Sequence, residues 1–307
     1  MIKNVLICGL GAVGITYANK LKDVCNLSIL ANKDRINRYK KNPLTLNGES
    51  LNLNYVTPES KAEQDLIIIS TKTNGLASAI SYIKNFVGEN TIILSLINGI
   101  HSEKEIAKTY GTNKVLHSYF IGHSAVRIDN NVLQDGVGKI VFGSPYPENN
   151  NKILNLKEFF ESNNIDFEIP EDIIYSLWLK YTLNIFSNQT SAIMNLTFGD
   201  MKHNKYFINF AKNIIAEVAS IAQKEGVNNT ENLETDSLTF LSKMIDSGKT
   251  SMLQDILASR ETEVDIFSGE IIKLGHFHNV DTPYNKILYE MVKIAEEKSK
   301  YQNAYVN

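Results

Sequence analysis

The 307-residue chain contains little cysteine, and its two cysteines are far from any motif spacing. Cys8 and Cys25 form no closely spaced pair, which excludes a zinc knuckle or a Cys-x-x-Cys redox motif. Cys8 lies in an apolar run, and an inert buried thiol is expected there. The pair His276 and His278 is more typical of a surface helix end than of a metal site. We therefore expect no bound metal.

The chain also lacks a long apolar run and an excess of charge of one sign. No run reaches the roughly 18 apolar residues of a membrane span, and no basic segment precedes the first apolar run, as a secretory signal would require. The 31 basic and 34 acidic side chains give a formal charge of -3, which attracts neither nucleic acid nor an anionic membrane. A cytoplasmic protein that acts on a small molecule is expected.

The first 120 residues alternate short apolar runs with helix-like stretches, which is typical of a parallel sheet covered by helices. The expected strands are Lys3–Cys8, Leu27–Leu30, Leu66–Ser70, Ile92–Leu96 and Val115–Tyr119. The expected helices between them are Ala12–Leu21, Leu76–Phe86 and Glu103–Thr109. The pattern predicts an α/β domain.

After Phe120 the pattern changes. Ala125–Leu133 and Lys139–Phe142 are joined through Gln134-Asp-Gly-Val-Gly138, which predicts a hairpin and an antiparallel extension of the sheet. A helix over Ile153–Ser162 and a last strand over Asp166–Ile169 complete this domain.

From Glu171 onward apolar residues recur at helical spacing, which predicts an all-α domain. The expected boundary lies at Pro170, giving a dinucleotide-binding domain over 1–170 and a helical substrate domain over 171–307. Its helices are expected over Ile173–Met194, Tyr206–Glu225, Thr235–Met244 and Glu263–Phe277. The apolar face of Phe207–Ile221 could form core or a homodimer contact, and core is the expectation.

A glycine motif, Gly9-x-Gly11-x-x-Gly14, follows the first strand and opens the first helix. In this context glycines permit a tight turn and let a dinucleotide's pyrophosphate approach backbone N–H groups at the helix N-terminus. A purely structural glycine turn is the alternative. The residues expected to contact the cofactor here are Gly9, Leu10, Gly11, Ala12, Val13 and Gly14.

The end of the second strand should meet the adenosine ribose of that cofactor. If Asn32 ends the strand, an amide flanked by Lys33 and Arg35 suits a 2′-phosphate and hence NADPH. If Asp34 reaches back, NADH becomes the cofactor. NADPH is the prediction, and solvated surface charge is the alternative role of the basic residues.

Two further polar residues follow strands at the carboxyl edge, where open α/β sheets bind ligands. Lys72 comes after Leu66–Ser70, and Asn98 comes after Ile92–Leu96. Either could be a simple turn former, but their common edge favours a role in binding.

A polar stripe marks the helical half, where Lys180, Asn184 and Asn188 recur every four residues in an aromatic and aliphatic stretch. A water-facing amphipathic helix is the plain interpretation. With a dihydronicotinamide nearby, however, Lys180 could protonate the oxygen of a carbonyl that accepts hydride. Glu263 is the candidate carboxylate beside Lys180, and Ser251 could join the two asparagines in holding an anionic substrate.

Other polar residues have weaker interpretations. Asp255 and Arg260 fit a helix-stabilising or substrate-framing network better than acid catalysis. His101, His117 and His123 could lie near the ligand, yet no pattern assigns any of them a base role.

Together these residues resemble the ketopantoate reductase (2-dehydropantoate 2-reductase) family over nearly the whole chain. The motifs that carry the resemblance are Gly9-Leu-Gly-Ala-Val-Gly14, Thr71-Lys72, Asn98-Gly99, Gly138-Lys-Ile-Val-Phe-Gly143, Trp178-x-Lys180-x3-Asn184-x3-Asn188 and Ser251-Met-x2-Asp255-x4-Arg260-x-Thr-Glu263-x-Asp265. The resemblance implies an N-terminal Rossmann domain and an all-α domain like that of 6-phosphogluconate dehydrogenases, with the active site in the cleft between them. It also implies NADPH-dependent reduction of 2-dehydropantoate to (R)-pantoate, a step towards pantothenate and coenzyme A.

The resemblance implies roles for individual residues as well. Lys180 would be the general acid, with Asn184, Asn188 and Ser251 holding the substrate. Asn98 would line the nicotinamide and substrate pocket, Lys72 would face the cofactor, and Glu263 would contact the cofactor ribose and help set Lys180.

The sequence departs from the family pattern in four places. Asn32 replaces a common Arg, and Gly75, Ile97 and Gln189 replace a common Gln, Gln and Pro. Gly75, Ile97 and Gln189 motivate one alternative, a paralogous reductase of another 2-oxo acid. A second alternative, from a different class, is a non-catalytic nicotinamide-sensing protein that keeps the Rossmann half. Retention of Lys180, Asn184, Ser251 and Glu263 argues against a sensor, because a sensor needs no proton donor.

Overall fold

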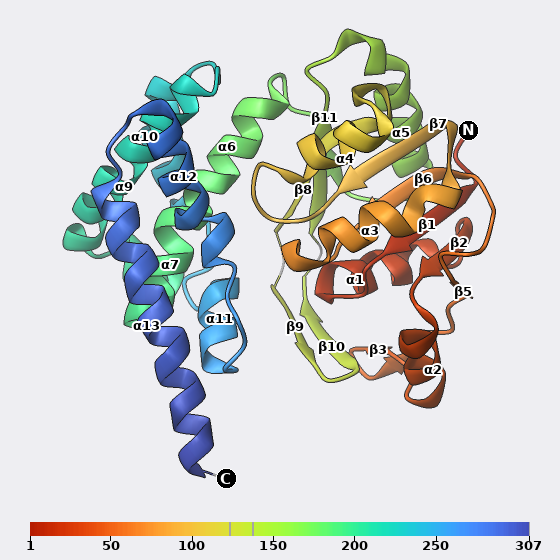
Figure 1. Ribbon diagram of the computed structural model, residues 1–307, viewed down its shortest axis with the longest axis horizontal. Coiled ribbons are helices and arrows are strands. Elements are labelled where there is room, and N and C mark those ends of the chain that lie inside the picture. The colour runs from red at the N-terminus through yellow and green to blue at the C-terminus, as the bar shows by residue number, and fades with distance from the viewer. Residues whose placement is uncertain (123, 137, 307) are drawn as a thin grey trace. The chain divides into compact units, whose positions relative to one another are not determined.

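The computed structural model describes residues 1–122, 124–136 and 138–306, with side chains described except at 124–126, 135 and 299–306. The chain divides into two compact units, Met1–Ile174 and Tyr175–Asn307. The first is an α/β unit and the second is helical (Figure 1). The expected fold class is confirmed.

An eight-stranded sheet organises the first unit, in the order β12-β11-β8-β7-β6-β1-β2-β5. Strands β5 to β8, with β1 and β2, pair in parallel, and β11 pairs antiparallel with β8. The strand bounds are β1 (Asn4–Cys8), β2 (Asn26–Leu30), β5 (Tyr55–Val56), β6 (Gln64–Ile69), β7 (Val87–Ser95), β8 (Val115–Ile121), β11 (Lys139–Gly143) and β12 (Phe167–Glu168).

Both faces of this sheet are covered, because side chains of successive strand residues enter opposite cores. Val5 and Ile7 of β1 enter one core with α1 (Ala12–Leu21) and α5 (Asn150–Ser162). Leu6 and Cys8 enter the other with α3 (Leu76–Tyr82) and α4 (Ser102–Tyr110). The parallel strands, their continuous apolar runs and the helices on both faces make this a doubly wound, Rossmann-like sheet.

The expected hairpin between Ala125–Leu133 and Lys139–Phe142 is wrong, because in the described part of the chain these two segments do not pair with each other. The segment 124–135 itself forms the hairpin β9 (Ser124–Ile128) and β10 (Asn131–Asp135), which turns at Asp129, where φ is +52°. This hairpin joins β3 (Thr45–Leu46) and β4 (Glu49–Ser50) in a separate sheet of order β4-β3-β10-β9. Only the antiparallel extension is confirmed, through β11. Val137 lies outside the described residues.

The second unit is built around two long helices. α9 (Lys205–Lys224) buries the face that carries Phe207, Ile214 and Ile221, so this face is core, as expected. α13 (Pro283–Val306) packs on α7, α9 and α12. The remaining helices are α6 (Ile173–Leu183), η5 (Asn184–Asn188), α7 (Gln189–Met194), α8 (Phe198–Lys202), η6 (Thr230–Asn232), α10 (Leu233–Ser242), α11 (Ser251–Leu257), η7 (Val264–Ile266) and α12 (Ser268–His278).

Several elements have no clear signal in the sequence. α2 (Lys33–Lys41) buries only Ile36 and Tyr39, and its many charges hide this short apolar face. α8, α11 and α13 and the 3-10 helices η1 (Thr73–Gly75), η2 (Ile83–Phe86), η3 (Thr112–Lys114) and η4 (Pro147–Asn149) were likewise not indicated as separate elements. All of these except the long helix α13 are short, and short elements depend on tertiary contacts rather than on propensity.

Across the described residues, no helix is both long and apolar enough to cross a membrane. The same part of the chain contains no group of three His, Cys, Asp or Glu side chains arranged to hold a metal ion.

Candidate functional site

The glycine turn between β1 and α1 requires glycine at two of its three positions. Gly9 has φ +108°, and a Cβ there would lie 2.7 Å from the carbonyl carbon of Ser70. A Cβ on Gly14 would lie 2.1 Å from the Gly9 carbonyl oxygen, which also accepts a 2.8 Å hydrogen bond from the Ser70 hydroxyl. Gly9 therefore allows the close approach to the end of β6, and Gly14 allows α1 to pack on the turn.

Gly11 has a different requirement, because its backbone is ordinary and nothing crowds it. It caps α1 at φ -72°, and the nearest atom to an added Cβ is the Ser70 carbonyl oxygen at 3.8 Å. Neither backbone conformation nor packing requires glycine at position 11, and the absent side chain leaves open space at the N-terminus of α1. The first N–H groups of a helix have no partner within the helix, so this space and the start of α1 at Ala12 and Val13 fit the approach of a pyrophosphate.

Arg127 of β9 also contacts this turn, and sequence patterns did not indicate it. Its Nη1 donates to the carbonyl oxygen of Leu10, and its Nε donates to the carbonyl oxygen of Asp129 at 2.7 Å. Leu10 is itself buried in the core, so any contact of this residue with a cofactor would be through its backbone. Nothing in the sequence links positions 10 and 127, since the hairpin alone brings them together.

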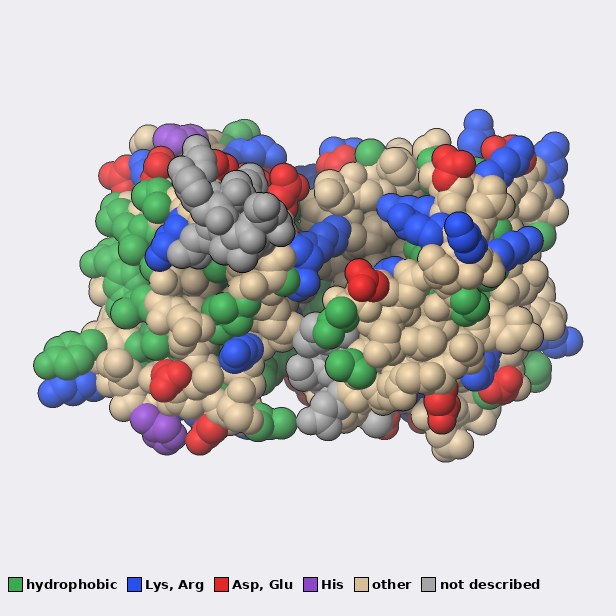
Figure 2. Space-filling view, turned by 90° about the horizontal axis from the view of Figure 1, so that it is seen from below, with side chains coloured by type: hydrophobic (Ala, Val, Ile, Leu, Met, Phe, Trp, Pro, Cys, Tyr) green, Lys and Arg blue, Asp and Glu red, His purple; other side chains and the backbone are tan. Residues whose placement is uncertain are grey.

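Asn32 has a structural role that the sequence did not reveal. It caps α2, and its Oδ1 accepts a 2.9 Å hydrogen bond from the backbone N–H of Arg35. The exposed basic side chains that follow are Lys33, Arg35, Arg38, Lys40 and Lys41. Figure 2 shows basic side chains gathered on one face of this unit.

Arg35 lies close enough to β1 to affect Cys8 at its end. Burial raises the pKa of the Cys8 thiol to about 12, and the positive charge of Arg35 opposes that rise. Cys8 is thus the inert thiol expected. The charge of Arg35 acts on Cys8 at the carboxyl edge of the sheet.

Lys72 and Asn98 are placed on this same edge by the strand register. Ile69 at the end of β6 pairs with Cys8 of β1 on one side and Ser95 of β7 on the other. The exposed Lys72 and the half-buried Asn98 each stand three residues beyond a strand end. The loop that carries Lys72 therefore leaves the sheet next to the glycine turn, and the loop that carries Asn98 leaves it one strand further along.

The polar stripe of the second unit is an interacting group. The Lys180 ammonium donates a 3.0 Å hydrogen bond to Asn184 Oδ1. Asn184 and Asn188 are 5% and 4% exposed, and Lys180 is half-buried. Burial lowers the pKa of Lys180 to about 8. A water-facing helix would expose these amides, and that interpretation is wrong.

The helix that carries the stripe is not a uniform α-helix, because Asn184–Asn188 forms a π-helix. An α-helix turns about 100° per residue, so two steps of four residues would turn Asn188 about 80° away from Lys180. A π-turn holds more residues and rotates less per residue, which reduces this drift. The π-helix therefore aligns the three side chains more closely than the expected α-helix would.

Ser251 joins the stripe from α11. The Asn188 side-chain amide donates to Ser251 Oγ at 3.4 Å. The preceding Thr250 caps α11 by accepting a 3.2 Å hydrogen bond from the Leu253 N–H. The structure thus brings together the expected acid and all three expected substrate ligands of this unit.

Glu263 is half-buried at the start of η7, and its pairing with Lys180 stays a prediction. One contact brings its segment near: the Tyr181 hydroxyl donates to the Ile266 carbonyl at 2.7 Å. Asp255 and Arg260 form an ion pair of 2.7 Å, which fits either expected role, helix stabilisation or substrate framing.

The histidines have separate environments. His278 is the last residue of α12, and its Nε2 lies 2.6 Å from the carboxylate of Glu225, which caps the end of α9. Burial lowers the pKa of His117 to about 4, which keeps it neutral at physiological pH. His123 lies outside the described residues.

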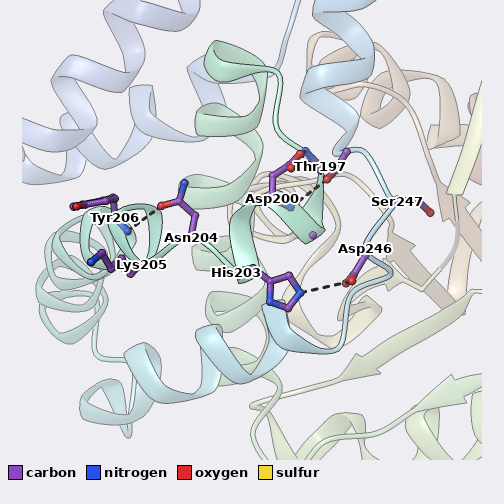
Figure 3. Close-up of a pocket in the computed structure, with 9 residues that line it drawn as sticks. Thr197, Asp200, His203, Asn204, Lys205, Tyr206, Asp246 and Ser247 are labelled. Atoms are coloured by element: carbon purple, nitrogen blue, oxygen red, sulfur yellow. Dashed lines mark hydrogen bonds and ion pairs between the residues drawn. The ribbon is translucent and has the colours of Figure 1, made fainter.

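An open hollow of about 900 Å³ also lies in the second unit, at the start of α9 (Figure 3). Its lining includes an Asp246–His203 contact of 3.7 Å and the capping pair Thr197 and Asp200. None of the expected site residues lines it.

Comparison with known proteins identifies the same family for the N-terminal and the C-terminal part of the chain. Residues 5–146 match the family described as ketopantoate reductase PanE/ApbA, and residues 172–296 match its C-terminal part. Proteins named 2-dehydropantoate 2-reductase from Streptococcus pyogenes and Pyrococcus horikoshii are each 27% identical to this chain, over 95% of it and 97% of the relative.

A solved structure of D-mandelate dehydrogenase with NADH and anilino(oxo)acetate has the same fold. Its TM-score is 0.85 at 22% identity, covering 96% of this chain and 99% of that one. The matches to both halves, with the motifs at the sheet edge and on the stripe, lead to one conclusion: the chain belongs to the ketopantoate reductase family.

Proposed function

We propose that this chain is an NADPH-dependent reductase that converts 2-dehydropantoate to (R)-pantoate in pantothenate and coenzyme A biosynthesis. The observation that carries the proposal is Lys180, whose ammonium lies in the stripe, bonded to Asn184. The family and the names of its relatives support the substrate.

Lys180 has the properties of a general acid. A pKa of about 8 keeps most of the ammonium protonated at neutral pH while making its proton easier to give up than that of an ordinary lysine. The ammonium of Lys180 has three N–H donors, and one of them is directed to Asn184 Oδ1. The other two would be able to donate to a substrate oxygen. Bound NADPH would supply hydride to C2 of the substrate, and Lys180 would protonate the C2 oxygen.

The remaining groups of the stripe would hold the substrate. With Oδ1 of Asn184 turned to Lys180, its amide nitrogen is the group left to donate. Asn188 and Ser251 add further polar atoms on the same side. Hydrogen-bond donors beside a positive charge favour an anionic ligand, and the carboxylate of a 2-oxo acid is such a ligand.

The first unit would hold the cofactor. The open space above Gly11 fits the pyrophosphate, and Lys33 and Arg35 fit the 2′-phosphate. Asn32 would act there indirectly, by fixing the first turn of α2. Lys72 and Asn98 would face the cofactor and its nicotinamide end, and Glu263 would contact the ribose and help set Lys180.

A second candidate function is the reduction of a different 2-oxo acid. The likeness to D-mandelate dehydrogenase favours it, since that enzyme was solved with NADH and an oxoacetate. Gly75, Ile97 and Gln189 motivate it as well. A nicotinamide sensor remains the third candidate, and it would bind cofactor without turnover.

The test is oxidation of NADPH and of NADH by the purified protein with 2-dehydropantoate and with a panel of other 2-oxo acids. We expect the highest kcat/KM with NADPH and 2-dehydropantoate. A clearly higher kcat/KM for another acid would establish the second candidate, and a preference for NADH would assign the ribose contact to Asp34. Cofactor binding without any turnover would establish the sensor.

A further inference from the structure

A chain of buried hydroxyl groups links the polar stripe to the start of α11. Ser191 Oγ donates to the Asn188 carbonyl oxygen at 3.0 Å and lies 2.5 Å from Thr250 Oγ1. Ser191 is fully buried and Thr250 is 2% exposed. We propose that Thr250 and Ser191 are positioning residues that fix Ser251 and Asn188 for the substrate, an inference that rests on the proposed function.

The direction of each hydroxyl proton follows from the number of donors. A hydroxyl has one proton, and Ser191 gives its proton to the Asn188 carbonyl. The Thr250 hydroxyl must therefore donate its proton to Ser191 Oγ, while the same Thr250 oxygen accepts a hydrogen bond from the Leu253 N–H. The result is a single directed chain from the N-terminus of α11 to the backbone of Asn188.

This chain closes into a ring through the side chains expected to bind substrate. Asn188 donates from its amide to Ser251 Oγ, and Ser251 is covalently next to Thr250. Because Ser251 accepts this bond, its own proton is directed elsewhere. Ser251 is exposed, so we expect it to donate to an oxygen of the substrate.

Capping of α11 does not explain the contact between Thr250 and Ser191. The cap needs only the Leu253 bond, whereas the bond to Ser191 joins α11 to α7 across 59 positions of the chain. α7 directly follows the π-helix that carries Asn184 and Asn188. Loss of the link should shift Ser251 relative to Asn188 without touching any atom of the substrate.

The variants that test this are Thr250→Val, which removes the hydroxyl at nearly constant shape, and Ser191→Ala. Each should raise KM for the 2-oxo acid roughly tenfold with little change in kcat, because the substrate and the transition state lose the same contact. The dissociation constant of NADPH should not change. Thr250→Ser keeps the hydroxyl and should restore KM.

Ser237→Ala is the matched control. Ser237 is also fully buried in this unit, but its Oγ has no hydrogen-bond partner among the described residues. This variant should leave KM unchanged whatever it does to thermal stability.

The double variant separates coupling from general damage, since both single changes break the same chain. Its KM should be close to that of either single variant rather than their product. Wild-type turnover with unchanged KM in Thr250→Val and Ser191→Ala would overturn this inference alone. Absence of turnover in the wild type would overturn the proposed function and this inference with it.

Discussion

Lys180→Met removes the proposed acid while keeping a side chain of similar length, and it should separate activity from stability. Without a proton donor, kcat should fall by roughly 10²–10⁴-fold. NADPH binding should be retained, because the expected cofactor contacts other than Glu263 lie in the first unit. The same change should stabilise the folded protein at neutral pH.

The stabilisation follows from the lowered pKa of Lys180. The folded protein holds this ammonium with a pKa of about 8 instead of 10.5. Between these values the unfolded chain binds more protons, so stability rises with pH there and is lowest below about pH 8. At 1.36 kcal/mol per pH unit the difference is about 3 kcal/mol, which is an upper value because Lys180 is only half-buried and also bonds Asn184.

Two measurements test this reasoning. Steady-state NADPH oxidation as a function of pH should show kcat/KM of the wild type falling above about pH 8, about tenfold per pH unit, as Lys180 of the free enzyme loses its proton. Residual activity of Lys180→Met should lack this limb. Thermal unfolding at pH 7 should show a Tm a few degrees above that of the wild type.

Lys212→Met serves as the control, since Lys212 forms an exposed ion pair of 2.8 Å with Glu234 in the same unit. It should change neither kcat nor the pH dependence of kcat/KM, and it should alter stability by less than about 0.5 kcal/mol. Unchanged kcat in Lys180→Met would refute the general-acid role. A lower Tm in that variant would refute the assigned cost of burying the ammonium.

Two further predictions concern the first unit. Gly14→Ala places a Cβ 2.1 Å from the Gly9 carbonyl oxygen and should lower both Tm and NADPH affinity, whereas Gly11→Ala has no close contact and should lower affinity alone, as thermal unfolding and fluorescence titration would show. Equal loss of Tm in both would contradict the assignment of Gly11 to the ligand. Burial raises the pKa of Glu103 to about 7, so the folded protein binds more protons than the unfolded chain between about pH 4.5 and 7, and stability falls as pH rises through that range. Glu103→Gln should flatten that fall in a series of Tm values, and a fall as steep as that of the wild type would assign it to other groups.

Much of the fold was determined by local patterns in the sequence. The parallel strands are continuous apolar runs because both faces of the sheet are buried, and such runs can be recognised without tertiary information. The glycine motif was equally readable, since Gly9 and Gly14 are required by backbone conformation and close packing that few other residues allow. The spacing of Lys180, Asn184 and Asn188 predicted a common face because helical periodicity is a local property.

The tertiary structure decided what no local pattern could express. Hydrogen-bond partners far apart in the chain gave the hairpin of β9 and β10 its own sheet and brought Arg127 to the glycine turn. The π-helix at Asn184–Asn188 depends on packing within the helical unit, because no spacing of apolar residues distinguishes it from an α-helix. The bond between Ser191 and Thr250 likewise joins hydroxyls 59 positions apart. The sequence thus determined which residue types lie on one face or at one strand end, and only the folded chain decided which of their atoms meet, because hydrogen bonds depend on distances that sequence spacing does not set.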